Sequence, residues 1–284
     1  SLSFISNSLI SSTQRFMSYE LGLGEKVHVY KVFSMSINIF AIFILVVLFL
    51  LESIGLYFLN NVLDVPEDRI FAANIVYQLS IITFCINIIR IPYNALIISN
   101  ERMSIYAYLS ILEVGLRLLI VYLIPLFPDK LIAYGAFILI VTLLINFTYI
   151  IYCRKEFPSD SKYHFEKNSQ LFKSMFGFSG WTLVGGVAGM ISSEGPNFLM
   201  NIFLGVRINA AMAIAKQVSA AVYSFASNFQ TAFNPQIVKT YAEKDYNNLY
   251  SIIFKTSKLS YYLLVIFAIP LILFATPVFN LWLD

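Results

Sequence analysis

Most of this chain consists of apolar runs that are long enough to cross a lipid bilayer. A membrane-spanning helix needs roughly 20 mostly apolar residues. The sequence contains about eight such runs, which cover residues 1–17, 33–59, 70–99, 104–126, 131–152, 172–204, 207–238 and 250–281. Of the 284 residues, 58% are hydrophobic and 12% are charged, whereas soluble domains have about 45–50% and about 25%. The sequence therefore predicts an all-α, polytopic bundle of transmembrane helices.

The charge and the reactive side chains of the chain exclude several classes of protein. A net charge of +3 is too small to indicate a nucleic-acid partner. Two cysteines and two histidines cannot build a disulfide framework or a histidine-based metal centre. The sequence has no Gly-rich phosphate loop and no Ser-His-Asp arrangement, and its predicted external loops are short. We therefore expect a transporter rather than an enzyme, without a metal or a cofactor.

One polar segment divides the chain into two predicted lobes. The segment 153–171 is the only plausible linker, and it separates an N-terminal lobe (1–152) from a C-terminal lobe (172–284). In alternate loops, Lys and Arg number 13 on one side and 3 on the other. Because basic loops stay in the cytoplasm, the linker is predicted to be cytoplasmic and the acidic loop 64–69 external.

A weak internal repeat relates the two lobes. A shift of 221 residues places the sequence Ser-Phe-Ile-Ser-Asn at 3–7 on Ser-Phe-Ala-Ser-Asn at 224–228. The same shift superposes the loop after residue 16 on the loop after residue 237. If the repeat is genuine, the first helix of the N-terminal lobe and the last helices of the C-terminal lobe lie outside this sequence. The chain is then a fragment with about eight of 12 to 14 helices.

Ionisable residues inside the predicted spans are the first candidates for function, because charge is expensive at membrane depth. They are Arg90, Glu113, Arg117, Glu194 and Lys216. Glu113 and Arg117 lie four residues apart, so they share a helix face and can form a structural pair. Arg90 can extend its charge to the inner headgroups. Alternatively, these side chains face a water-filled cavity and attract an anion.

Glu194 directly precedes Gly195 and Pro196, and a proline inside a helix deletes a hydrogen bond and favours a kink. Transporters line their pathways with interrupted helices of this kind. Glu194 is therefore the candidate for coupling transport to H⁺ or Na⁺. The alternative is a neutral carboxyl group that is hydrogen-bonded within the helix packing.

Several short stretches resemble the polysaccharide-biosynthesis membrane proteins of bacteria. The stretches are Gln14-Arg15-Phe16-Met17-Ser18-Tyr19-Glu20-Leu21-Gly22, Ile91-Pro92-Tyr93-Asn94-Ala95, Glu101-Arg102-Met103, Asn209-Ala210-Ala211, Lys216-Gln217-Val218 and Asn234-Pro235-Gln236-Ile237-Val238-Lys239-Thr240-Tyr241-Ala242. They are similar to the O-antigen-type flippases of lipid-linked oligosaccharides, which share a superfamily with the multidrug and toxin exporters. The resemblance covers essentially the whole chain.

The resemblance implies two helical lobes like those of the multidrug exporters, a central cavity and alternating access in the bacterial cytoplasmic (inner) membrane. The implied substrate is an oligosaccharide on polyprenyl pyrophosphate, which is turned from the inner to the outer leaflet. We expect Arg15, Arg90, Arg117 and Lys216 to form a cationic track for the pyrophosphate. Two alternatives remain, a cation-coupled multidrug exporter and a membrane glycan polymerase or acyltransferase.

Overall fold

The computed structural model of the chain describes residues 3–24, 26–62, 66–277 and 280, and this part is helical without any strand. The all-α prediction is confirmed. In chain order the α-helices and their bounds are α1 (Ser3–Gly22), α2 (Lys26–Leu50), α3 (Leu56–Asn61), α4 (Ile70–Ser99), α5 (Met103–Leu123), α6 (Lys130–Glu156), α7 (Ser169–Leu204), α8 (Val206–Ala242) and α9 (Tyr246–Leu273). A π-helical turn, Leu51–Gly55, joins α2 to α3, and short 3₁₀ turns are formed by Glu67–Arg69 and Ile124–Leu126.

Six helical segments of the described part are long and apolar enough to cross a membrane, so the chain is a multi-pass membrane protein. They are His28–Asn61, Glu67–Ser99, Met103–Leu126, Lys130–Glu156, Ser169–Ser193 and Tyr246–Leu273. The sequence predicts eight spans, and the helices over the other two ranges, α1 and α8, are more polar. In α1 the polar residues Ser12, Thr13, Gln14 and Ser18 are buried. This helix therefore packs its polar side chains among its neighbours.

The chain divides into two compact units, Ser1–Leu183 and Val184–Asp284, and the division falls inside α7. The predicted linker 153–171 lies within the first unit. Its residues are docked on α2, because Tyr163 Oη donates to Asn38 Oδ1 at 2.8 Å and Asn38 Nδ2 donates to the carbonyl of Glu166 at 3.1 Å. The predicted lobes, 1–152 and 172–284, stay a prediction.

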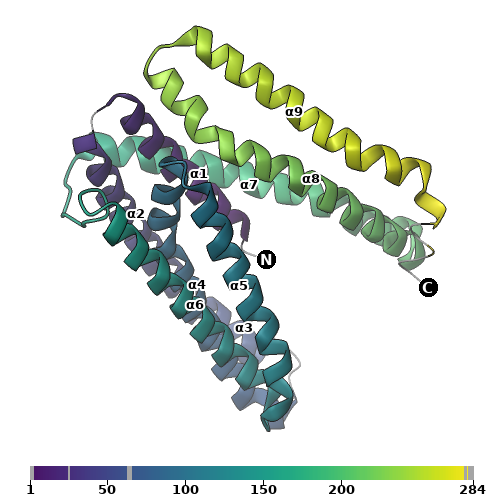
Figure 1. The fold of residues 1–284 in the computed structure, drawn as a ribbon. Coiled ribbons are helices and arrows are strands. Elements are labelled where there is room, and N and C mark those ends of the chain that lie inside the picture. Colours follow the sequence, from purple (N-terminus) through teal and green to yellow (C-terminus); the bar gives the residue numbers. More distant parts are fainter. Residues whose placement is uncertain (1–2, 25, 63–65, 278–279, 281–284) are drawn as a thin grey trace. The chain divides into compact units, whose positions relative to one another are not determined.

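In the first unit α4 is the central helix, since it contacts α1, α2, α5 and α6 (Figure 1). The whole stretch from Ile91 to Ser99 is buried. Phe33 of α2 packs edge-to-face on Tyr93 of α4, with ring centroids 5.1 Å apart. At the opposite end, Arg69 Nη1 donates to Asp129 Oδ2 at 2.9 Å. These two residues directly precede α4 and α6, so the two helices start at the same end and run parallel.

Asp129 also caps α6, because its carboxylate accepts hydrogen bonds from the amides of Leu131 and Ile132. The bond from Ile132, together with that from Leu131 and the charge of Arg69, holds the pKa of Asp129 below its ordinary value. Such bonds favour the ionised form. The cap therefore stays charged at neutral pH.

Three helical hairpins share one turn geometry. In the turns α1–α2, α4–α5 and α8–α9, the second residue after the helix has a positive φ: Gly24 at 75°, Glu101 at 61° and Lys244 at 60°. In each turn the first residue after the helix donates to the carbonyl four residues back, and the second donates three residues back. The α1–α2 and α8–α9 turns are related by a shift of 220 residues. This is one residue from the shift of 221 that the sequence predicts.

The predicted orientation is tested by labelling single cysteines from either side of the membrane. Ser161 is buried and its Oγ donates to the carbonyls of Cys153 and Phe157, so a cysteine there would react poorly. Lys162 and Asn61 are exposed and are the better positions. We expect a membrane-impermeant maleimide to label Asn61→Cys in intact cells and Lys162→Cys only after lysis. Labelling of both from outside would contradict the 13-to-3 count of basic residues.

Candidate functional site

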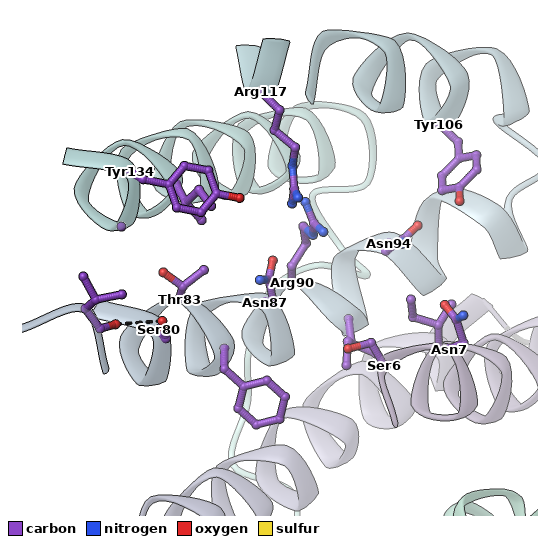
Figure 2. A pocket seen from close by; sticks show the side chains of 16 residues that line it. Ser6, Asn7, Ser80, Thr83, Asn87, Arg90, Asn94, Tyr106, Arg117 and Tyr134 are labelled. Carbon is purple, nitrogen blue, oxygen red and sulfur yellow. Dashed lines mark hydrogen bonds between the residues drawn. The ribbon is translucent and has the colours of Figure 1, made fainter. Parts of the chain in front are cut away.

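A polar cavity of about 570 Å³ lies inside the first unit, between α1, α4, α5 and α6 (Figure 2). Ten of its 16 lining residues are polar or charged: Ser6, Asn7, Ser80, Thr83, Asn87, Arg90, Asn94, Tyr106, Arg117 and Tyr134. Polar groups are costly within apolar helices unless water or a ligand satisfies them. A cavity with this lining is therefore built to hold water or a polar ligand.

One face of α4 provides half of these polar side chains. Ser80, Thr83, Asn87, Arg90 and Asn94 line the cavity, and they follow each other at intervals of three or four residues. That spacing places them on one side of an α-helix.

On the other side of the cavity, α6 approaches α4 closely at Gly135. A Cβ atom added at Gly135 would lie 3.3 Å from Leu79 Cδ1 and 3.5 Å from Val76 Cγ2. The glycine therefore allows the close contact of the two helices beside the cavity.

Two arginines share one carboxylate at the cavity. The predicted pair of Glu113 and Arg117 is present, with Arg117 Nη2 donating to Glu113 Oε1 at 2.7 Å. Arg90 of α4 binds the same carboxylate, and its Nη1 donates to Oε2 at 2.8 Å. The side chains of Arg90 and Glu113 are only 19% and 20% exposed. Because arginine stays protonated, this three-residue group carries a net charge of +1.

Both guanidinium groups lie at the cavity. Figure 2 shows Arg117 reaching from α5 toward Arg90 on α4, so that the two charged ends meet. The guanidinium of Arg90 also lies over the ring of Tyr149, 5.5 Å from its centroid, which is within the range of a cation–π contact. We call Arg90 and Arg117 the arginine pair. Both bind the same carboxylate, and their predicted roles in the track stay predictions.

Asn94, which lines the cavity, carries an unsatisfied acceptor. The residue is 7% exposed, and its Oδ1 atom has no hydrogen-bond partner among the described residues. Buried polar atoms are almost always paired in proteins. This oxygen is buried beneath the lining, so it is not itself accessible from the cavity.

The other predicted site residues lie elsewhere. Arg15 is exposed, with its guanidinium 4.4 Å from the ring centroid of Phe178, and it does not line the cavity. Lys216 belongs to the second unit, where its Nζ donates to the backbone carbonyl of Ser193. The side chain of Glu194 lies outside the described residues. Their predicted roles in the track and in ion coupling stay predictions.

Within the described ranges, no group of three or more His, Cys, Asp or Glu side chains could hold a metal ion. Comparisons of the chain with protein-family models, with curated proteins and with solved structures gave no match. What the chain does must therefore be inferred from its own residues.

The positions of Arg90 and Glu113 relative to the α4–α5 turn are enough to predict that the two residues are in contact. The α4–α5 turn is centred on Glu101, and Arg90 lies 11 residues before it and Glu113 12 residues after it. Residues at nearly equal distances from the turn of a helical hairpin lie at about the same level. The neutral residues Asn87 and Asn94 were also missed, although they flank Arg90 at helical spacing.

Proposed function

We propose that this chain is a membrane transporter that flips oligosaccharide linked to polyprenyl pyrophosphate. It moves the lipid from the inner to the outer leaflet of the bacterial cytoplasmic membrane, by alternating access, for the synthesis of surface polysaccharide. The observation that carries the proposal is the arginine pair at a polar cavity inside a bundle of apolar helices.

A pyrophosphate group cannot cross the hydrocarbon of a membrane without compensation of its charge. In a cavity of low dielectric, each ion contact is several times stronger than in water. Arginine suits phosphate because its planar fork donates two hydrogen bonds and keeps its charge when buried. Arg90 and Arg117 together provide a net positive charge after Glu113 is counted, so the group attracts an anion.

The sign of the cavity charge favours a flippase over a cation-coupled multidrug exporter. An exporter of cationic drugs would prefer acidic side chains in its cavity. Both charged residues among those that line this cavity are arginines, and neither an aspartate nor a glutamate is found there within the described part.

The neutral side chains of the cavity suit the sugar part of the proposed substrate. Asn87, Asn94, Tyr106 and Tyr134 offer hydrogen-bond donors and acceptors beside the arginine pair. Sugar hydroxyls can fill both roles. A group that is anionic at one end and rich in hydroxyls at the other therefore matches the lining.

Complementation tests the proposed function. The full-length gene is expressed in a bacterial strain that lacks its surface-glycan flippase, with the empty vector as control. We expect surface glycan to return, as measured by gel electrophoresis and glycan-specific staining. If the protein inserts at normal levels and glycan stays inside the cell for every glycan type tested, while resistance to cationic drugs rises, the exporter alternative holds instead.

A further inference from the structure

The carboxylate of Glu113 in α5 binds one arginine of its own helix and one of α4, without itself lining the cavity. Its Oε2 accepts from Arg90 of α4 and its Oε1 accepts from Arg117 of α5, at 2.8 and 2.7 Å. Both arginines are among the cavity-lining residues and Glu113 is not. An anion in the cavity would therefore meet the guanidinium groups, while the carboxylate contacts the same groups from outside the lining.

This arrangement leaves the arginines able to bind a second anion. A guanidinium group has five N–H donors, and one Nη atom of each arginine is used in the bonds to Glu113. The remaining donors can face a phosphate. The charge of Glu113 nevertheless lowers the attraction, because it reduces the net charge of the group from +2 to +1.

A transport site must bind its substrate and also release it. Binding that is too strong stops transport, so the sites along a pathway must hold their ligand only moderately. Two bare arginines in a low-dielectric cavity would hold a pyrophosphate tightly. A fixed carboxylate that stays bonded to both arginines weakens this hold, because its negative charge repels the anion.

We propose that Glu113 is a built-in counter-ion that sets the release of the anion from the arginine pair. This proposal rests on the proposed function, because it assumes that the cavity binds a phosphate-bearing substrate. Glu113 is a positioning residue here, since it touches the arginines and not the anion. A purely structural role, in which Glu113 only ties α4 to α5, predicts a different result when its charge is removed.

The test measures binding of inorganic pyrophosphate to the purified full-length protein by equilibrium dialysis, together with glycan export in the complementation strain. Glu113→Gln keeps the shape of the side chain and removes its charge. We expect pyrophosphate to bind about tenfold more tightly, because an opposing charge beside the site is lost. Export should fall several-fold at an unchanged protein level. Glu113→Asp keeps the charge and should bind pyrophosphate nearly as the natural protein does.

If Glu113 only holds α4 and α5 together, the result is different: the Glu113→Gln variant binds pyrophosphate as weakly as the natural protein or more weakly. That outcome overturns the proposal. The variant Glu113→Gln with Arg117→Gln keeps a net charge of +1 and serves if the single variant does not fold. Its affinity should fall by less than about tenfold, since the donors of Arg117 are lost while the net charge is kept, and a larger loss contradicts the counter-ion role. If Arg90→Ala leaves pyrophosphate binding unchanged, the proposed function itself fails, whatever Glu113 does.

Discussion

Replacing Arg90 by alanine is expected to abolish glycan export while the protein still inserts into the membrane. The change removes the net positive charge of the arginine pair, because Glu113 then neutralises Arg117. Loss of one partner of a buried charge pair typically costs 2–5 kcal/mol, so the affinity for pyrophosphate should fall by about 30-fold or more. Export is measured as surface glycan in the complementation strain, and affinity by dialysis with inorganic pyrophosphate.

The loss should come from charge at the cavity and not from unfolding. Arg90→Ala leaves the Glu113 carboxylate bonded to Arg117, so no buried carboxylate loses all of its partners. Arg90→Lys should restore export only in part, because an ammonium group keeps the charge and lacks the planar fork. Arg69→Ala is the matched control: it removes one arginine of an ion pair away from the cavity and should export normally. Normal export by Arg90→Ala would exclude the arginine pair as the anion site.

Local patterns in the sequence are sufficient to predict the helices and one of the two ion pairs of Glu113, the pair with Arg117. Glu113 and Arg117 belong to the same helix, so their spacing alone predicts their contact. The contact of Arg90 with Glu113 depends on the packing of α4 against α5, and only the position of the α4–α5 turn hints at it. Which face of α4 carries the cavity is visible in the polar spacing from Ser80 to Asn94. The depth of the cavity depends on how the helices pack against each other, and the sequence alone does not reveal this packing.

The predicted spans over α1 and α8 show a second limit. Both helices are present and extend beyond the predicted ranges, to Gly22 and Ala242. They carry many hydroxyl and amide side chains, and hydropathy alone cannot distinguish a lipid-facing helix from one packed among others. The hydroxyl oxygen of Ser12 in α1 lies 2.8 Å from that of Ser179 in α7. Such a contact between helices far apart in the sequence explains why a polar helix is tolerated in the bundle.

The π-helical turn Leu51–Gly55 interrupts a span that the sequence predicts to be continuous from 33 to 59. Tyr77 of α4 donates from its hydroxyl to the carbonyl of Leu51 at 2.6 Å, and Gln78 Nε2 donates to Glu52 Oε2 at 3.1 Å. The turn thus presents backbone and side-chain acceptors to α4. Within a membrane, polar backbone groups of an irregular helix need such partners.

Gly55→Ala is expected to destabilise the protein by about 3 kcal/mol, through steric overlap and a lost hydrogen bond. A Cβ atom at Gly55 would lie 2.0 Å from Tyr77 Oη and 3.1 Å from its Cζ. The ring of Tyr77 must therefore move, and its hydroxyl must leave the carbonyl of Leu51. Helix propensity alone predicts the opposite sign, since alanine is favoured over glycine by about 1 kcal/mol in a helix. The free energy of unfolding is measured by titration with sodium dodecyl sulfate in mixed micelles.

Two further variants isolate the overlap with the tyrosine hydroxyl. Tyr77→Phe alone should cost about 1 kcal/mol, the value of one hydrogen bond. In the Tyr77→Phe background the overlapping oxygen is gone, so Gly55→Ala should then cost only about 1 kcal/mol, a coupling of about 2 kcal/mol between the two positions. Gly115→Ala in α5 is the control, because nothing lies within 4 Å of its added Cβ, and it should be neutral or stabilising. If Gly55→Ala stabilises the protein as Gly115→Ala does, the close approach of Tyr77 to the π-helical turn is not present in the membrane.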